Sequence, residues 1–293
     1  MSKRNALSLT QFFALLCLVT ILGCASWKAP PSLQNAMQHV SSGPTQTHLT
    51  NKKRLILEVE FVKLPIFSAD SDALEDSWQR VDETRLDPEV RHRLIANGIR
   101  AGIVLDIHQF RQDLQELSAE EDVLDTFLNQ ASIASSVAQG QQRIPMRYGR
   151  RYELPVCNPG EGEQVTLLQL EDETIGRTLT GAQYLLAMTG RETSISEQIQ
   201  LRVRPEVQYG ESKPKFVTSD TALRIDSRRE AWSIEPLEME LTLQEGETIT
   251  IAPTLPLKGL AKQMLSSAGP DQQTQQTIIL IRVAQVPTAI DQL

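Results

Sequence analysis

Residues that commonly carry catalysis or bind metals are few in this chain, and their spacing forms no known motif. His39 and His48 lie in a polar N-terminal stretch, while His92 and His108 are far apart and have no companion cysteine. The sequence contains no His-Glu-x-x-His, Cys-x-x-Cys, Gly-x-Ser-x-Gly or glycine-rich phosphate loop, the patterns that gather metal ligands, a nucleophile or phosphate-binding amides. We therefore predict no catalytic residue, no metal ligand and no cofactor, although a catalytic triad can also assemble from distant residues.

The residues best suited to bind a charged partner are arginines. Four of them are interleaved with Met146, Tyr148 and Tyr152 over residues 143–151: Arg143, Arg147, Arg150 and Arg151. Arginine beside aromatic rings can bind phosphates, lipid headgroups, acidic glycans or the acidic face of a partner. The same pattern also suits a solvated hairpin around Gly149 whose cations pair with neighbouring carboxylates.

Glutamates later in the chain could supply a complementary surface. They occupy alternate or nearby positions of an expected hairpin: Glu235, Glu238, Glu240, Glu245 and Glu247. A basic and an acidic surface on one chain could direct head-to-tail assembly, although runs of charge are usually only solvated.

The N-terminus has the pattern of a secretory signal. Lys3 and Arg4 are followed by the apolar run Phe12–Leu22, which ends at Gly23 and Cys24. As a helix this run would rise only about 16 Å, too little to cross a bilayer. One interpretation is an ordinary secretory signal followed by a chance cysteine. The other is a signal whose cysteine carries a lipid.

Leu22-Gly23-Cys24 resembles the lipobox of bacterial lipoproteins. The resemblance implies that residues 1–23 are removed as a signal peptide and that diacylglycerol is joined to the thiol of Cys24. Membrane contact would then be made through this lipid, at the cell envelope, and Ala25 after the cysteine favours the outer membrane. Two or three acyl chains would hold the protein firmly, because each buried methylene contributes about 0.8 kcal/mol.

The net charge and the cysteine content limit which partners are expected. The chain has 29 Lys+Arg and 37 Asp+Glu, so removal of Lys3 and Arg4 changes the net charge from 29 − 37 = −8 to 27 − 37 = −10. This balance argues against nucleic-acid binding. With Cys17 removed and Cys24 lipidated, Cys157 is the only free thiol, and its apolar surroundings in sequence predict a small buried side chain.

The elements that would position these residues predict an α+β fold. Residues 24–53 are polar and proline-containing, and we interpret them as the lipidated N-terminus and a flexible tether. A small strand-helix-strand unit is expected over 54–107, with a helix that starts at Asp87-Pro88 and stops at Asn97-Gly98. A helical connector is expected over 108–140, strengthened by a capping box at Ser118–Glu121.

From residue 141 to 287 the pattern predicts a mainly antiparallel β domain, followed by a short tail, 288–293. In each strand apolar and polar residues alternate, so we expect sheets with one face in water. Leu237–Leu243, the turn Glu245-Gly246 and Thr248–Ile251 predict a hairpin. The expected strands are Gln142–Arg147, Arg151–Val156, Gln164–Leu170, Thr178–Met188, Gln198–Val207, Thr221–Ile225, Leu237–Leu243, Thr248–Ala252 and Thr277–Val286.

Residues from about 195 to 286 weakly resemble the core domain of secretins, the ring-forming outer-membrane proteins of secretion and pilus machines. The resemblance lies in four segments: Leu201–Val207, Glu245–Ile251, Lys258–Ala261 and Thr277–Ile281. The chain departs from that family because 208–222 are short, polar and proline-containing, and because few aromatic residues are present for a membrane belt. The resemblance therefore implies a reduced, secretin-like relative rather than a channel.

Together these features predict a lipid-anchored bacterial envelope protein with a structural or assembly role. The expected partners are the membrane, further copies of the chain or another envelope protein, and the role includes that of a reduced secretin-like component of a secretion or pilus system. Two alternatives stay open, an envelope hydrolase and a ligand-binding lipoprotein. The hydrolase would need a deep pocket with a raised carboxyl pKa or a Ser–His contact, and the ligand-binding protein would need a pocket of several hundred Å³.

Overall fold

The structure is a computed structural model that describes residues 54–66, 71–118, 141–171, 173–195, 197–218, 223–269 and 273–287. The expected signal peptide, Cys24, the tether and the tail lie outside these residues, as do residues 119–140, the last two thirds of the expected helical connector. The described residues belong to one compact unit.

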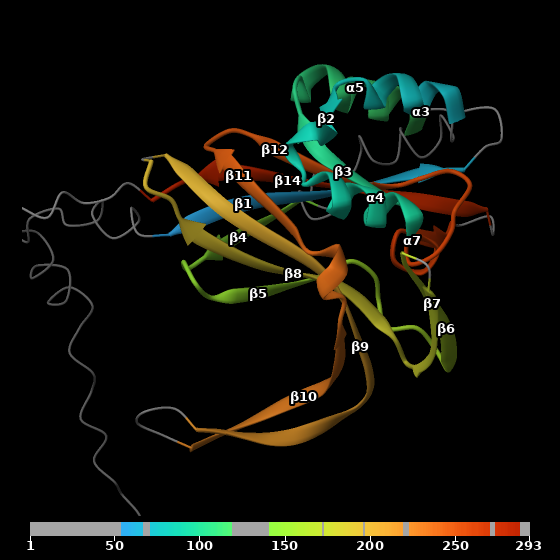
Figure 1. The fold of residues 1–293 in the computed structure, drawn as a ribbon, viewed down its shortest axis with the longest axis vertical. Helices are drawn as coiled ribbons and strands as arrows, with labels where there is room; N and C mark the ends of the chain where they lie inside the picture. The colour runs from blue at the N-terminus through green and yellow to red at the C-terminus, as the bar shows by residue number, and fades with distance from the viewer. Residues whose placement is uncertain are drawn as a thin grey trace, which may run out of the picture. The chain divides into compact units, whose positions relative to one another are not determined.

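Most strands belong to two antiparallel sheets (Figure 1). Among the described residues the first sheet has seven strands in the order β2-β3-β12-β14-β1-β4, and β13 pairs with the start of β14. Strands from both ends of the described chain therefore share one sheet. The strands of the first sheet are β1 (Leu55–Pro65), β2 (Val81–Asp82), β3 (Ile99–Val104), β4 (Gln141–Met146), β12 (Thr248–Pro253), β13 (Ser266–Ala268) and β14 (Thr274–Gln285).

The second sheet has five described strands in the order β10-β9-β8-β5, with β11 also paired to β9. Its longest strand, β9, pairs with β8, β11 and β10 at different positions along its length. The strands are β5 (Arg151–Pro155), β8 (Gln183–Glu192), β9 (Gln198–Thr218), β10 (Leu223–Ser233) and β11 (Met239–Gln244). A separate hairpin is formed by β6 (Glu163–Leu170) and β7 (Glu173–Thr180).

The first sheet is covered on both faces. One face packs against the second sheet, with Ile279 and Ile281 of β14 in the same core cluster as Val203 of β9. The other face packs with α3 (Ser71–Trp78) and α5 (Ile107–Ser118). The rings of Trp78 and Phe110 meet there edge to face, with centroids 6.4 Å apart. The layers are thus helices, first sheet and second sheet.

This layering corrects the expectation that every sheet has one face in water. All six residues of β12 are buried. In β14, Ile278 and Leu280 belong to the core beneath the helices, while Ile279 and Ile281 belong to the core between the sheets. An unbroken apolar run such as Ile278–Ile281 is typical of a strand covered on both sides.

Local signals placed one helix correctly. Helix α4 spans Pro88–Ala96, and Asp87 Oδ1 accepts hydrogen bonds from the backbone N–H groups of Glu89 and Val90 at 2.9 and 3.2 Å. Gly98 follows with a φ of 76°, a conformation that glycine adopts cheaply. The remaining described helical segments are η2 (Glu83–Arg85), η3 (Glu235–Leu237) and α7 (Ala261–Met264).

Two expected strand connections are wrong. The turn at Glu245–Gly246 does not close a hairpin, because β11 pairs with β9 in the second sheet whereas β12 pairs with β3 and β14 in the first. The strand expected over Thr178–Met188 is divided at Gly181, with β7 before it and β8 after it. Alternation and turn residues indicate where strands begin and end, but they do not indicate which strands pair.

The expected strands and helix are present within residues 54–107, but they do not form a sheet of their own. Strand β1 lies between β14 and β4, and β3 lies between β2 and β12. The apolar faces of β1 and β3 are buried by strands from the C-terminal part of the chain. The expected α+β class with a mainly antiparallel β domain is confirmed, and its two expected parts share the first sheet.

The buried side chain of Asn97 joins α4 to β6. Its Nδ2 donates to the carbonyl oxygens of Arg93 and Gln169 at 2.8 and 2.7 Å, and its Oδ1 accepts from the Gln169 N–H at 2.7 Å. We expect Asn97→Ala to lower the free energy of unfolding by about 2 kcal/mol, because backbone groups of Gln169 lose their partner. Urea denaturation measures this loss. His92→Ala, on the exposed side of the same helix, should change stability by less than about 0.5 kcal/mol, and equal losses would contradict the prediction.

Candidate functional site

The four arginines expected to form one basic patch are divided by the fold. Arg143 lies in β4 of the first sheet and Arg151 begins β5 of the second, so residues 147–150 carry the chain from one sheet to the other. Gly149 makes this turn with a φ of 70° and donates its N–H to the carbonyl oxygen of Gly190 at 2.9 Å. The segment is a connection between sheets and not a hairpin within one.

The four side chains also differ in their surroundings. Arg143 pairs with Glu58 of β1, with Nε 3.4 Å from Oε1. Arg151 joins a larger network described below. Arg147 and Arg150 are exposed and make no ion pair with another described residue. Two of the four cations therefore pair with carboxylates, and contact of Arg147 and Arg150 with a charged partner stays a prediction.

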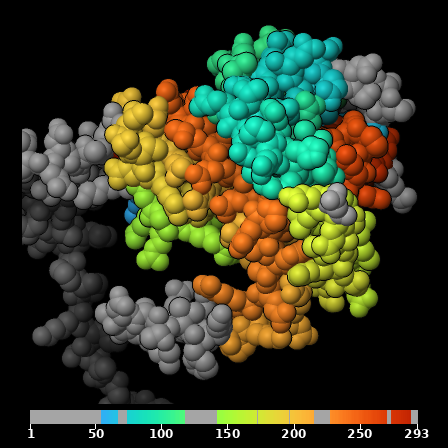
Figure 2. Space-filling model, viewed as in Figure 1, coloured from blue at the N-terminus to red at the C-terminus, as the bar shows by residue number. Residues whose placement is uncertain are grey.

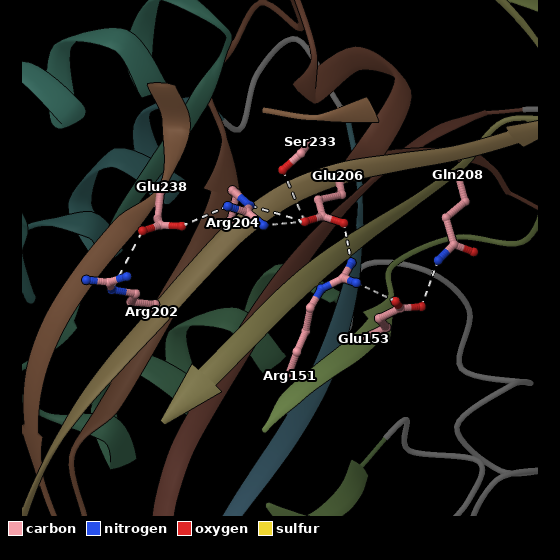
Figure 3. Close-up of polar contacts among 8 residues, drawn as sticks. All are labelled: Arg151, Glu153, Arg202, Arg204, Glu206, Gln208, Ser233 and Glu238. Carbon is pink, nitrogen blue, oxygen red and sulfur yellow. Dashed lines mark hydrogen bonds and ion pairs between the residues drawn. The ribbon is translucent and has the colours of Figure 1, made fainter. Parts of the chain in front are cut away.

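A network of arginines and glutamates covers the outer face of the second sheet (Figure 3). At its centre is Glu206 of β9, which is only 3% exposed to solvent. Its Oε1 accepts from Arg204 at 2.8 Å and from Ser233 at 3.3 Å, and its Oε2 accepts from Arg151. A buried carboxylate is tolerated only when charged and polar donors surround it, and three side chains from three strands meet this requirement.

The network continues in both directions from Glu206. Toward β11, Arg204 pairs with Glu238 at 3.2 Å and Arg202 pairs with Glu240 at 2.6 Å. In the other direction, toward β5, Arg151 pairs with Glu153 at 2.9 Å. Gln208 donates to the other oxygen of the Glu153 carboxylate at 2.7 Å.

The period of a β-strand explains why these residues meet. Residues 202, 204, 206 and 208 occupy every second position of β9, so their side chains project from one face of the sheet. Val203 and Val207 between them point the other way and are buried in the core. This network was missed in the sequence, although alternation of charged and apolar residues in Arg202-Val203-Arg204-Pro205-Glu206 was a usable signal for it.

Four of the five glutamates expected to form an acidic partner surface are engaged within the chain, and the fifth, Glu235, is exposed at the start of η3. Glu238 and Glu240 pair with arginines of β9, Glu245 accepts from the backbone N–H of Val286 at 3.0 Å, and Glu247 accepts from that of Gln244 at 2.7 Å. Fewer unpaired carboxylates are therefore available for head-to-tail pairing with the basic surface of another copy than the sequence suggested.

The β9–β10 hairpin extends from this charged face, and Figure 2 shows the molecule hollowed between its base and strand β5. Arg229 holds the base, because its guanidinium donates to the carbonyl oxygens of Gly210, at 2.9 Å, and Gly181. The guanidinium of Arg177, from β7, lies 4.3 Å from the ring centroid of Trp232. Arginines from two elements thus fix the base of the hairpin against the body.

Farther out, the two strands are tied by polar side chains. Ser212 and Ser227 share a hydrogen bond of 2.8 Å, and Lys213 Nζ lies 3.0 Å from Glu230 Oε1. The hydrogen bond and charge of Lys213 lower the pKa of Glu230. These contacts lie in water and contribute little stability, so they set the register of the ribbon more than they hold it together.

The other candidate residues are dispersed. His92 and His108 are exposed on α4 and α5. Cys157 is partly buried just after β5, and burial raises the pKa of its thiol. Among the described residues no three or more His, Cys, Asp or Glu side chains are grouped so as to hold a metal ion.

We expect Arg151→Met to lower the free energy of unfolding by about 1–2 kcal/mol, because the buried Glu206 carboxylate loses one of its two cationic partners. The matched change is Arg143→Met, whose ion pair is solvent-exposed, and it should cost less than about 0.5 kcal/mol. Adding Glu206→Gln to Arg151→Met should recover part of the loss. Chemical denaturation of the intact protein, Arg151→Met, Glu206→Gln and the double variant measures the coupling, and additive effects would contradict it.

Comparison with known proteins finds no matching family model, no similar curated protein and no similar solved structure. In the part of the chain that the structure describes, no helix is long and apolar enough to cross a membrane.

Proposed function

We propose that this chain is a lipid-anchored protein of the bacterial cell envelope that assembles with further copies of itself through the β9–β10 hairpin. The observation that carries the proposal is the outer part of this hairpin. Residues 209–218 of β9 pair, among the described residues, with β10 alone. Residues 198–208 of the same strand pair with β8, β11 or both, and so belong to the body of the second sheet.

A two-stranded ribbon in water is only marginally stable, because it has no third strand or helix on which to bury a face. It also presents two edges of unpaired backbone N–H and C=O groups, which are a template for pairing with another chain. An edge of β9 in one copy and the edge of β10 in the next can pair by main-chain hydrogen bonds. Such an interface is head-to-tail and closes into a ring when the rotation between copies allows it.

The base of the hairpin supports this role. Glu206, Arg151 and Arg204 lie near the point where β9 stops pairing with β8, and Arg229 ties the hairpin to the loop after β7. An assembly element must be held in one orientation, because an interface formed by a freely moving segment must also offset the lost conformational freedom. The charged network supplies this orientation without covering the edges.

Two features of the sequence add to the proposal. The resemblance of Leu22-Gly23-Cys24 to a lipobox supports attachment to a membrane, where confinement to a surface would favour contact between copies. The resemblance to secretins falls partly on β9 and implies a ring-forming relative. A reduced secretin-like component of a secretion or pilus system is the finer form of the proposal.

The anchor is tested by Cys24→Ser. This change should abolish metabolic labelling of the protein with radioactive palmitate and move it from the membrane fraction to the soluble or secreted fraction. Cys17→Ser, in the expected signal peptide, should leave both properties unchanged because that thiol is removed with the signal. Retained labelling of the Cys24→Ser protein would refute lipid attachment at this residue.

The assembly role is tested by deleting residues 211–228. This leaves Gly210 and Arg229 as a two-residue turn that closes the existing pair Tyr209–Glu230, and glycine at the first turn position suits a type II′ turn. We expect the intact protein to sediment as oligomers in detergent at micromolar concentration and the deletion protein to sediment as a monomer.

Two controls make this result specific. The deletion protein should keep a β-type circular dichroism spectrum, reduced only by the strand residues removed, and its unfolding midpoint, which shows that the body is folded. Lys213→Ser should leave the oligomer intact, because main-chain pairing does not need this side chain. A monomeric intact protein, or oligomers of the deletion protein, would overturn the proposed role of the hairpin.

A further inference from the structure

The end of the molecule at which the described chain begins carries several exposed arginines. Arg54 directly precedes β1, which pairs with β4, and β4 runs into the turn at residues 147–150. In this turn Gly149 donates its N–H to the carbonyl oxygen of Gly190 in β8 at 2.9 Å. Strand β8 in turn lies against β1, because a β-carbon on Gly190 would come within 2.6 Å of the Leu55 side chain. Four arginines of these three segments are exposed and form no ion pair with another described residue, and we call them the basic surface: Arg54, Arg147, Arg150 and Arg191.

The carboxylates described beside the basic surface do not cancel its charge. Glu192 is exposed next to Arg191, and burial together with the charge of Glu192 raises the pKa of Tyr148 to about 12. Glu58 lies nearby on β1 but is already paired with two other arginines, of β4 and β14, at 3.4 and 3.5 Å. Four cations therefore stand against the single carboxylate of Glu192.

More acidic residues lie at the same end of the molecule, across the first sheet. They surround the connection from β11 to β12, where Glu245 and Glu247 accept hydrogen bonds from backbone N–H groups and the Glu197 carbonyl oxygen accepts from the Glu245 N–H at 3.3 Å. Strands β14 and β1 separate β12 from β4 in the sheet. Next in sequence to this end, residues 50–53 add two lysines and residues 288–293 add one aspartate, so the side of the basic surface keeps its positive charge.

An exposed isoleucine lies beside the basic surface. It belongs to the connection between β8 and β9, which directly follows Glu192, and Ile195 there is 58% exposed. Thr193 Oγ1 donates to the carbonyl oxygens of Ile195 and Gln198 at 2.9 and 3.1 Å and so holds the backbone of this connection. Cations with a neighbouring apolar side chain suit a membrane surface, because the cations attract anionic headgroups while the apolar group enters the boundary with the acyl chains.

The position of this end in the chain favours a membrane as its partner. Residues 25–53 connect Arg54 to Cys24, so a lipid on Cys24 would hold the basic surface closer to the bilayer than other parts of the body. The chain as a whole has 37 acidic and 29 basic residues, so an anionic bilayer would repel the rest of the body. The β9–β10 hairpin leaves the second sheet at the opposite end of β8, where Gln183 pairs with Gln208, and stays accessible to other copies.

We propose that the basic surface docks on a bilayer containing anionic phospholipids, with its arginines at the headgroups and Ile195 at the boundary with the acyl chains. The proposal rests on the proposed lipid anchor and gives the anchored body an orientation. Arginine suits this contact because its planar guanidinium can form two parallel hydrogen bonds with one phosphate group. Since the contact is exposed and electrostatic, salt should weaken it.

Vesicle binding tests the proposal without the lipid. In the full chain with Cys24→Ser, co-sedimentation gives the dissociation constants for phosphatidylcholine vesicles with and without about one third phosphatidylglycerol. The apolar run Phe12–Leu22, where it is retained, contributes to both constants, so their ratio reports the preference for anionic lipid. We expect this preference to be at least tenfold at low salt and to disappear at about 0.5 M sodium chloride.

Charge variants locate the contact. Arg147→Gln combined with Arg150→Gln should reduce the preference at least fivefold, because each cation near an anionic surface strengthens binding several-fold. Lys258→Gln combined with Lys262→Gln removes the same charge from exposed residues near β13, at the opposite end of the first sheet, and should leave the preference unchanged. Glu192→Gln should increase the preference, a gain that loss of folding cannot produce.

An apolar pair of variants tests insertion. Ile195→Ser should weaken binding to anionic vesicles about threefold without any change of charge, because less apolar surface enters the bilayer. Val165→Ser changes a residue of β6 that is similarly exposed, at 55%, and lies outside the basic surface. This second variant should bind as the parent chain does.

Several results would overturn the proposal. Equal binding of neutral and anionic vesicles by the Cys24→Ser chain would exclude docking on anionic lipid, and equal losses in the two double variants would show that only net charge matters. A full preference in the Arg147→Gln, Arg150→Gln protein would place the contact elsewhere. Lipid attachment is measured separately by palmitate labelling, so its failure with vesicle binding intact would refute the anchor and leave the docking surface in place.

Discussion

The burial of β14 on both of its faces is the constraint on which the rest of the structure depends. This strand pairs with β1 from Ile56↔Gln285 to Pro65↔Gln275 and with β12 on its other side. Its consecutive residues Ile278–Ile281 supply alternate side chains to the two cores, and complete burial of each such side chain is worth about 1.5–3 kcal/mol. Because β1 and β14 come from opposite ends of the described chain, neither core can form until the C-terminal strand is in place.

The second sheet depends on this arrangement and in turn positions the hairpin. Its inner face is buried by the first sheet, so its outer face is free to carry charge. Glu206 has the largest desolvation cost of the residues described on that face, because its carboxylate is buried and must be surrounded by hydrogen-bond donors. The donors come from β5, β9 and β10, and their convergence fixes the direction in which β9 continues as a ribbon. The first half of β9 thus belongs to the core, whereas residues 211–214 of the same strand are exposed.

Local patterns in the sequence predicted several elements well. Asp87, Pro88 and Gly98 bounded α4 because caps and glycine act within a few residues, and strict alternation identified β11. In the β9–β10 ribbon the same method did less well, because residues 211–214 and 227–228 are exposed and show no apolar alternation. Only the first half of β9 was expected, and the expected strand Thr221–Ile225 covers only the start of β10. The network at Glu206 was also missed, because it combines residues from segments that are distant in sequence.

The sequence by itself determined the local conformations, the α+β class, the lipobox-like N-terminus and the absence of a contiguous catalytic motif. Only the tertiary structure decided which strands pair, so it alone showed that Glu245–Gly246 passes between sheets and that Arg143 and Arg151 lie in different sheets. The physical reason is that ladder hydrogen bonds join identical backbone groups and carry little sequence information. The choice among partners is made by which faces can be buried together, a property of the whole chain rather than of any one segment.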